Sequence, residues 1–515
     1  MKKNSPLPRS FWLLLLTGLA LRCVALNQPL VDAHLMRQCQ TADAVKSLIE
    51  EPGWHLSSRV SWLGDTEARL LLEFPLYSYL VLGVFEIMHQ LDASGKIVSI
   101  LLWAASFRCL QLIWRRALDE EQTFWANALF VFSPLSIFFG QAFMPEMLIQ
   151  LCAFGFLAAL LAYRESHRPA HLLLCGLVGL LGMLVKTPAF SHYYLVAGLV
   201  LFEKESWRAL TRLSYWTLLL ITGACVKGWA WLVDKVNQTG FPEWTASATL
   251  PSLIGSLHDR FTFHPYLKYA AYIGVFAVTP AGLVCGLAGL VAAAREAAKY
   301  RLLLYWCVSL AFFYACWGPR TAGEHSYYNL PALAPFCALF GVGIAAFREW
   351  LACRVSPQSA RRLAATAAVV LVVPFAAIGS LYLFRQDRTT YEAALWARDN
   401  TSPGDLVLFK SNHRADVIDY AHITPFSYYA QRKAWVYTRL MGAERRARAL
   451  STSTWAVVTT HEAPDYVDKW RRLLRGGEAP FEPQDITWLE REGGFTRFAE
   501  TDQYTVYRKM RVPDL

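Results

Sequence analysis

The amino-acid sequence predicts a polytopic α-helical membrane protein that ends in a small soluble domain. Of the 515 residues, 55% are hydrophobic and 17% are charged, whereas soluble globular proteins carry about 25% charged residues. Twelve apolar runs of spanning scale precede residue 385, and none follows it. The net charge of +10 would suit a nucleic-acid-binding protein, but most of it borders the apolar runs. We therefore expect lipid partners and no nucleic acid.

The first run, 11–26, follows Lys2, Lys3 and Arg9 and has the layout of a secretory signal peptide. Eleven further apolar runs follow it, and a bilayer core is crossed by about 20 apolar residues in a helix. We therefore expect the run to be an uncleaved first span.

The Lys and Arg residues of the loops predict the topology, because in short loops these residues stay on the cytoplasmic side. Twelve spans would make the loops at Arg115 and Arg164 external. If run 74–91 instead lies along or re-enters the outer face, the inner segments carry 17 Lys and Arg in 56 residues and the outer ones 8 in 112. We thus predict a cytoplasmic amino terminus, an extracytoplasmic carboxyl domain and eleven spans, at 11–26, 97–114, 123–142, 147–163, 170–186, 189–202, 213–233, 267–294, 302–317, 327–347 and 363–384.

The sequence divides at residue 384 into a membrane domain (1–384) and a soluble domain (385–515). In the soluble part, 390–400 predicts a helix that ends before Pro403 and Gly404. Short β-type runs follow at 405–409, 455–459 and 503–507, so we expect a small α/β or α+β domain. Phosphate-binding glycine loops and HExxH, CxxC and GxSxG motifs are absent from the sequence.

Ionisable groups near the membrane point to a functional site, since such groups are costly there. Asp32, His34 and Arg37 lie a few residues past the first span. An Asp in this place could take a proton from a hydroxyl nucleophile or hold a cation. It could equally cap a helix over 33–49, and the two roles are compatible.

Other polar residues fall in loops of the same predicted face. Each of them alone would be explained by snorkelling or by an ion pair, but five loops converging on one face favour a site. The cations among them, with Arg37, could bind a phosphate or pyrophosphate, for which a lipid-linked donor fits the compartment. The group comprises Glu73, Glu146, Lys186, Arg320, Glu324, His325, Tyr327 and Tyr328.

Seven segments of the sequence resemble the bacterial relatives of the dolichyl-phosphate-mannose protein mannosyltransferases. These relatives are GT-C type membrane glycosyltransferases, and the aminoarabinose transferase of lipid A is among them. In order and spacing the resemblance covers residues 1 to about 345. The segments are DAHLMRQCQTA (32–42), VSWLG (60–64), EFPLY (73–77), SPLS (133–136), FMPE (143–146), LVKTP (184–188) and HSYYNLP (325–331).

The resemblance implies juxtamembrane helices in the first outer loop and a bacterial cytoplasmic membrane as the location. It implies that Asp32 is the general base towards an acceptor hydroxyl, that Glu146 is a second acidic site residue, and that Lys186 lies near the donor phosphate. By looser matches, Glu73 and His264 correspond to groups that touch a divalent metal in some relatives. The sequence departs from the mannosyltransferases at Ala33, where they carry a second acidic residue, and in the soluble domain, so the sugar and the acceptor stay open.

The leading functional prediction is transfer of a sugar from a polyprenyl-phosphate carrier to a hydroxyl of a glycan, lipid or protein, with inversion at the anomeric carbon. A transporter or flippase would instead need charges inside the spans, for which Arg22, Arg108 and Lys227 are the candidates. A catalytically inactive relative that binds a partner through its external domain is a third class.

Overall fold

The computed structural model describes residues 7–317, 325–411, 416–438, 442–460 and 488–510. These residues form two compact units. Unit 1 comprises residues up to Gln28 together with Leu71–Phe384, and unit 2 comprises Pro29–Leu70 together with the chain from Arg385 onward. Each unit is described separately below.

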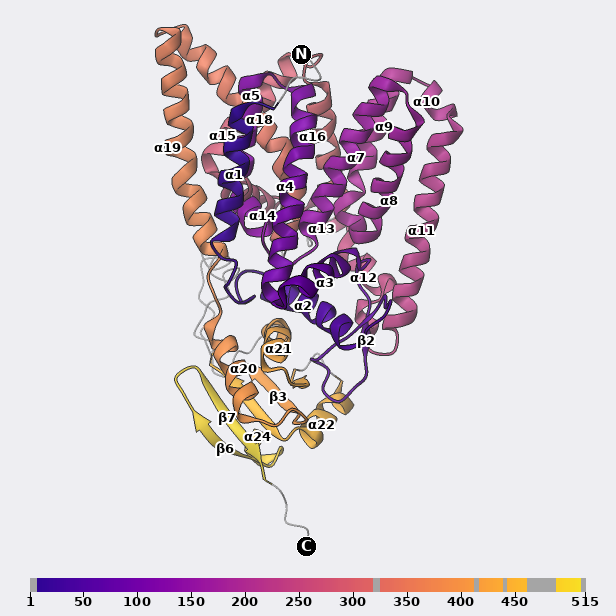
Figure 1. The fold of residues 1–515 in the computed structure, drawn as a ribbon, viewed down its shortest axis with the longest axis vertical. Helices are drawn as coiled ribbons and strands as arrows, with labels where there is room; N and C mark the ends of the chain where they lie inside the picture. The colour runs from indigo at the N-terminus through magenta and orange to yellow at the C-terminus, as the bar shows by residue number, and fades with distance from the viewer. Residues whose placement is uncertain (1–6, 318–324, 412–415, 439–441, 461–487, 511–515) are drawn as a thin grey trace. The chain divides into compact units, whose positions relative to one another are not determined.

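Unit 1 is helical, and its long helices run side by side in Figure 1. Its described elements are α1 (Arg9–Cys23), α3 (Leu76–Met88), α4 (Leu91–Ala117), α5 (Glu120–Phe132), α6 (Pro134–Phe139), α7 (Glu146–Ser166), α8 (Pro169–Phe190), α9 (His192–Glu205), α10 (Arg208–Thr211), α11 (Leu213–Asn237), η1 (Pro242–Trp244), α12 (Ala246–Ile254), α13 (Leu257–Phe261), α14 (Phe263–Tyr272), η2 (Ile273–Ala277), α15 (Thr279–Arg295), α16 (Arg301–Cys316), η3 (Ser326–Asn329), α18 (Leu330–Ala352) and α19 (Pro357–Leu383).

Each of the eleven expected spans falls on one or more of these helices. Within the described ranges, six helices are long and apolar enough to cross a membrane, and a seventh joins them if a bent pair counts as one span. The total of eleven and the orientation stay predictions. Helix α3, which covers run 74–91, has 13 residues, fewer than the about 20 that a crossing needs.

The expected span 267–294 differs from a single helix, because the chain bends by 110° between Tyr266–Ala277 and Thr279–Arg295. At the bend, directly before Pro280, Thr279 has a positive φ of 67°, a conformation that β-branched residues rarely adopt. Beyond the bend, α15 packs against α18 with the two backbones in direct contact. A Cβ on Gly289 would lie 1.9 Å from the Leu339 carbonyl oxygen, so this close approach requires glycine.

The charged candidates inside the spans do not form one group. Arg108 and Lys227 are exposed on the surface of unit 1. Arg22 is fully buried, donates to the Gly18 carbonyl at 2.9 Å and to Ser136 Oγ at 2.7 Å, and stacks 3.6 Å from the centroid of the Trp103 ring. The guanidinium therefore joins α1, α4 and α6 through hydrogen bonds and a cation–π contact.

Unit 2 contains a five-stranded mixed sheet in the order β4-β3-β5-β7-β6. Strands β3, β4 and β5 are parallel, and β7 runs antiparallel to β5 and β6. Helix α20 lies on the expected helix 390–400, and strands β3, β5 and β7 overlap the expected β-type runs 405–409, 455–459 and 503–507. The extracytoplasmic location of this part stays a prediction. The described elements are α2 (Leu35–Glu50), β1 (Ser58–Arg59), β2 (Arg69–Leu70), α20 (Arg388–Asn400), β3 (Val407–Ser411), α21 (Asp416–Ala430), β4 (Ala434–Val436), α22 (Ala443–Thr452), β5 (Trp455–Thr459), α24 (Trp488–Arg491), β6 (Phe495–Glu500) and β7 (Tyr504–Lys509).

The structure differs from the expected domain division at residues 29–70, which belong to unit 2 rather than to the membrane domain. The physical reason is the free edge of the sheet, because an unpaired edge strand leaves its backbone groups without partners. The Ala434 amide donates to the Ser61 carbonyl, and the Gly64 amide donates to the Ala434 carbonyl, both at 2.8 Å. Gly64 has a φ of +57° and faces the Trp435 ring, which a Cβ would approach to 2.0 Å. Segment 61–64 thus covers edge strand β4 at Ala434.

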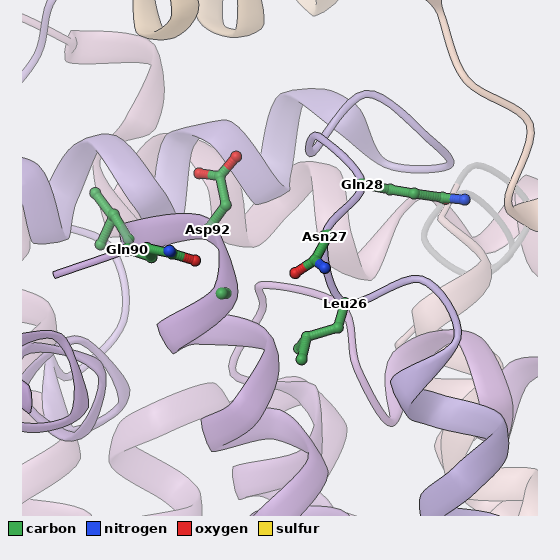
Figure 2. A pocket seen from close by; sticks show the side chains of 7 residues that line it. Leu26, Asn27, Gln28, Gln90 and Asp92 are labelled. Carbon is green, nitrogen blue, oxygen red and sulfur yellow. The ribbon is translucent and has the colours of Figure 1, made fainter. Parts of the chain in front are cut away.

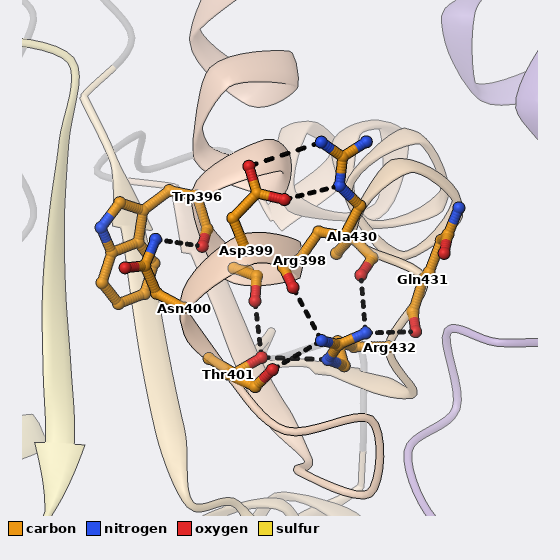
Figure 3. A network of polar contacts seen from close by, with 9 residues as sticks. Trp396, Arg398, Asp399, Asn400, Thr401, Ala430, Gln431 and Arg432 are labelled. Atoms are coloured by element: carbon orange, nitrogen blue, oxygen red, sulfur yellow. Dashed lines mark hydrogen bonds and ion pairs between the residues drawn. The ribbon is translucent and has the colours of Figure 1, made fainter.

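Arg432 closes the carboxyl end of α20, as Figure 3 shows. Its guanidinium donates to the carbonyls of Arg398 at 2.8 Å and Thr401 at 2.6 Å, and to Thr401 Oγ1 at 3.0 Å. The last carbonyls of a helix have no partner within it, and a cation there also stabilises the helix dipole. The residue is 8% exposed, so these bonds are shielded from water.

Replacing Arg432 by Met should destabilise unit 2, because the part-buried carbonyls of Arg398 and Thr401 lose their donor, and a fully buried unsatisfied acceptor costs about 1–3 kcal/mol. We expect the melting temperature of the purified chain, or of its first transition, to fall by several degrees, and protease cleavage near residue 400 to become faster. Arg497→Met is the matched control, since Arg497 is 53% exposed in an ion pair with Glu500. Equal melting temperatures for the two variants would contradict this assignment.

Candidate functional site

The site in unit 1 is built around a break in helix α8. Lys186 has φ −159° and ψ 85°, which are not helical values. Pro188 follows two residues later and has no amide hydrogen, so the Leu184 carbonyl, four residues before it, loses its usual donor. The Phe74 amide donates to that carbonyl instead, at 3.4 Å. The break therefore turns Lys186 out of the helical path and brings the segment that contains Glu73 alongside it.

Glu146 reaches the same place from the start of α7. It is the first residue of that helix, where the positive end of the helix dipole stabilises a carboxylate. The preceding loop is fixed by α4: Ser99 Oγ donates to the Ala142 carbonyl at 2.7 Å, and the Phe143 ring fills the space that a side chain on Gly95 would occupy. The backbone is therefore held on both sides of Glu146, by contacts with α4 before it and by helix α7 after it.

The ammonium of Lys186 and the carboxylate of Glu146 form a buried ion pair with an Nζ–Oε1 distance of 2.5 Å. Their side chains are 7% and 3% exposed. The ammonium also lies 4.0 Å from the centroid of the Tyr327 ring and 5.0 Å from that of Tyr328. We call these four residues the Lys186 site. A buried charge is costly unless it is paired, and here the cation is held by one anion and two aromatic faces.

The remaining predicted residues of this face have different positions. His325 is exposed and stacks on Tyr327 with a centroid distance of 5.1 Å. Glu73 is half-buried and precedes the Phe74 amide described above. Arg320 and Glu324 lie outside the described residues. The backbone of His264 lies in α14, and its side chain is outside the described part. The structure thus places Glu146, Lys186, Tyr327, Tyr328 and His325 together, and their roles stay predictions.

Asp32, His34 and Arg37 lie in unit 2. Asp32 is 3% exposed, and Gln38 Nε2 donates to its Oδ1 at 2.5 Å. The alternative that Asp32 caps the following helix is wrong, because α2 starts at Leu35 with His34 as its N-cap residue, in left-handed conformation and without a side-chain cap bond. Arg37 hydrogen-bonds the side chain of Gln40. The approach of these residues to the Lys186 site stays a prediction.

Within the described part of the chain, three or more His, Cys, Asp or Glu side chains nowhere gather closely enough to hold a metal ion. The metal role implied for Glu73 and His264 stays a prediction, and we route no chemical step through a metal.

Sequence reasoning missed the residues that support the site. Phe139 of α6 packs edge-on against Tyr327 at 6.4 Å, and Ser99 and Tyr77 hold the loop before Glu146. The Tyr77 hydroxyl donates to the Gly95 carbonyl at 2.9 Å. Their partners are distant in sequence, so no local pattern marks them. Pro188 was a usable signal, because a proline inside an apolar run predicts a kink at the residues before it.

Comparisons with known proteins agree with this architecture. The family model described as dolichyl-phosphate-mannose-protein mannosyltransferase matches residues 73–231. ArnT from Cupriavidus metallidurans, solved bound to undecaprenyl phosphate, is similar with a TM-score of 0.57 and 12% identity over 98% of this chain and 99% of that chain. The oligosaccharyltransferase AglB from Archaeoglobus fulgidus, solved with an inhibitory peptide and a dolichol-phosphate, is similar with a TM-score of 0.55 and 12% identity over 88% of this chain and 69% of that chain. None of the curated proteins matches the sequence.

The chain therefore has the GT-C fold of membrane glycosyltransferases. The resemblance that the sequence predicted is confirmed. The chain is similar to the dolichyl-phosphate-mannose protein mannosyltransferases over 73–231 and to ArnT over nearly its whole length.

The ion pair of the Lys186 site makes a stability prediction with a characteristic pattern. Glu146→Gln or Lys186→Met alone leaves a buried charge unpaired and should cost about 3–5 kcal/mol, whereas the double variant should recover most of that loss. Thermal unfolding of the purified variants measures the pattern. The exposed pair Arg116–Glu165, between α4 and α7, is the control, and its disruption should cost about 1 kcal/mol or less. A double variant as unstable as the sum of the single ones would show that the pair is uncoupled.

Proposed function

We propose that this protein transfers a sugar from a polyprenyl-phosphate donor to a hydroxyl acceptor at the outer face of the cytoplasmic membrane. The observation that carries the proposal is the Lys186 site, a buried ammonium at a broken helix, between a carboxylate and two tyrosine rings. The GT-C fold supports the reaction class, and the neighbours solved with undecaprenyl phosphate and dolichol-phosphate support the type of carrier.

Lys186 and Arg37 are the groups that we assign to the donor phosphate. An ammonium that has one carboxylate partner can donate a further hydrogen bond to a phosphate oxygen, because it carries three donor hydrogens. The guanidinium of Arg37 suits two phosphate oxygens at once. The tyrosine rings keep the Lys186 ammonium in place while its anionic partners change. Glu146 in this scheme orients the ammonium and limits the positive charge of the empty site.

Asp32 is the group that we assign to the acceptor. Its carboxylate removes the proton of the acceptor hydroxyl as the hydroxyl oxygen forms its bond to the anomeric carbon. The bond between that carbon and the phosphate oxygen breaks in the same step, and polyprenyl phosphate leaves with the electron pair. A single displacement of this kind inverts the anomeric centre. Gln38, which donates to the Asp32 carboxylate, keeps it directed as an acceptor.

A lipid or lipid-linked sugar transporter is the second candidate, and a partner-binding protein without catalysis is the third. The transporter has less support, because Arg108 and Lys227 are exposed and Arg22 is bound by Gly18, Ser136 and Trp103. Incubating membranes with a radiolabelled polyprenyl-phosphate sugar separates the three functions. Label transferred to an acceptor supports the enzyme, label moved across the bilayer without transfer supports the transporter, and neither supports the binding protein.

Asp32→Asn should lower the transfer rate by about 10² to 10⁴, the usual contribution of a general base. The variant should insert and fold, because the amide retains an oxygen that can accept from Gln38. Transfer is measured with the purified variant and the radiolabelled donor. Glu67→Gln is the control, since Glu67 lies in the same segment with a 61% exposed side chain. Full transfer by Asp32→Asn would remove the general-base role from this residue.

Donor binding should depend on Lys186 and Arg37 rather than on Asp32. Lys186→Met, made together with Glu146→Gln to avoid an unpaired charge, and Arg37→Met should each weaken donor binding about tenfold or more, as for loss of a hydrogen bond to a charged group. Binding of a fluorescent undecaprenyl phosphate to detergent-solubilised protein measures this. Lys46→Met in α2 is the control for Arg37. An unchanged dissociation constant in both variants would argue against a phosphate site here.

A further inference from the structure

Asp32 lies four residues after the point where the chain leaves unit 1, and that point is itself held in place. The ammonium of Lys96, in α4, donates to the carbonyls of Ala25 at 2.8 Å and Gln28 at 2.6 Å. Figure 2 shows this turn beside the start of α4, with the Gln28 side chain directed away from it. On the side of unit 2, the buried backbone before Asp32 needs partners of its own.

Two polar groups from the carboxyl-terminal part of the chain bind the backbone just before Asp32. The Leu30 amide donates to the Tyr429 hydroxyl at 2.5 Å, and the Asp387 amide donates to the Val31 carbonyl at 2.6 Å. Leu30 and Val31 are 0% and 1% exposed, so water does not replace these partners. Residues that follow hundreds of positions later in the chain therefore fix the start of this segment.

Helix α2 provides the other bonds of the segment. Cys39 Sγ donates to the Leu30 carbonyl at 3.3 Å. Gln38 Nε2 donates to the Ala33 carbonyl at 3.0 Å, in addition to its bond with the Asp32 carboxylate. Helix α2 thus orients the Asp32 side chain, whereas the carboxyl-terminal part holds the backbone that carries it.

The side chain of Asp387 keeps its amide directed at Val31. As the N-cap residue of α20, its carboxylate accepts from the Thr390 amide at 3.3 Å and from the Thr390 hydroxyl at 2.7 Å. His422 Nε2 lies 3.1 Å from Asp387 Oδ2. The carboxylate is thereby bound both by its own helix and by α21, which limits the movement of the residue.

Helix α21 carries both anchoring side chains, His422 and Tyr429. They are seven residues apart, which is two helical turns or about 10 Å, so they lie on one face of the helix. The Tyr429 ring packs edge-on against the Tyr391 ring of α20, with a centroid distance of 4.8 Å, and α21 packs against α2. Helix α21 therefore reaches the Asp32 segment directly through Tyr429 and indirectly through Asp387.

We propose that Asp387, His422 and Tyr429 are positioning residues for Asp32, so that the carboxyl-terminal part of the chain belongs to the catalytic apparatus. This inference rests on the proposed function, in which Asp32 removes the proton of the acceptor hydroxyl. A displacement of about 1 Å at a reacting group can lower a rate by about 10². Loss of one anchoring bond should lower kcat and leave donor binding unchanged, because the groups assigned to the donor phosphate lie in α2 and in unit 1.

A double-variant cycle on the purified full chain tests the coupling. Tyr429→Phe removes the acceptor of the Leu30 amide and should lower kcat about threefold to tenfold, as for the loss of one ordinary hydrogen bond. In an Asp32→Asn background the same change should lower the residual transfer less than twofold, because the carboxylate that it positions is gone. Tyr391→Phe removes a hydroxyl from the ring beside Tyr429 and is the matched control, with unchanged kcat. An equal loss in both backgrounds would show that Tyr429 does not act through Asp32.

His422 permits a test by rescue. His422→Leu removes a partner of the Asp387 carboxylate and should lower kcat severalfold. His422→Gln should restore most of the rate, since its amide can donate to the same carboxylate. The dissociation constant for fluorescent undecaprenyl phosphate should stay within about twofold of wild type in both variants. Equal kcat values for the two variants, or a dissociation constant that changes together with kcat, would contradict a positioning role.

Hydrogen–deuterium exchange of peptides that cover residues 29–34 provides a measurement that needs no activity. Exchange should become at least about fivefold faster in Tyr429→Phe and stay at the wild-type rate in Tyr391→Phe, because only the first change removes a partner of the Leu30 amide. Unchanged exchange together with undiminished transfer in Tyr429→Phe would overturn the inference while the proposed function stands. Faster exchange in a chain whose wild type transfers no sugar would refute the proposed function, although the anchoring of the Asp32 segment would stand.

Discussion

The break in α8 at Lys186 is the constraint on which the site in unit 1 depends. A proline at 188 removes one backbone donor, and the orphaned Leu184 carbonyl is taken over by the Phe74 amide. The same break directs a lysine into the protein interior, where Glu146, Tyr327 and Tyr328 make its charge tolerable. One local defect thus determines which loop lies beside the site and where its cation stands. Contacts from Phe74, from Glu146 and from the two tyrosines offset the free energy that the helix break and the buried charge cost.

The supports of the site lead back to α4 and α6. Ser99 and Gly95 of α4 hold the loop before Glu146, while Phe139 of α6 braces the Tyr327 ring. Arg22 ties α6 to α1 and to Trp103 of α4. Burying a guanidinium without a carboxylate partner costs desolvation free energy. A methionine would fill much of the same volume without this cost. We infer that the direction of its hydrogen bonds, rather than its packing, makes the arginine useful here.

Much of this architecture could be read from the sequence. The apolar runs located the helices, and short runs of β-type residues located β3, β5 and β7, because residues buried in lipid or in a sheet form recognisable apolar segments. Lys186 and Glu146 could be selected because they lie between apolar runs on the predicted outer face, and ionisable groups at membrane level are costly. The bend at Thr279 and the placement of segment 61–64 could not be predicted in the same way. The first depends on a single residue before Pro280, and the second on a free strand edge that lies hundreds of residues away in the chain. Asp32 was found by its residue type, but its hydrogen bond from Gln38 was not.

The membership of residues 29–70 in unit 2 has a consequence for dissecting this protein. The polypeptide passes between the two units three times, after Gln28, Leu70 and Phe384. A chain that ends at residue 384 would therefore contain unit 1 together with residues 29–70, and Ser61 and Gly64 would lose Ala434 as their backbone partner. Unit 2 expressed separately would therefore need both residues 29–70 and the chain from residue 385 onward, joined by a linker.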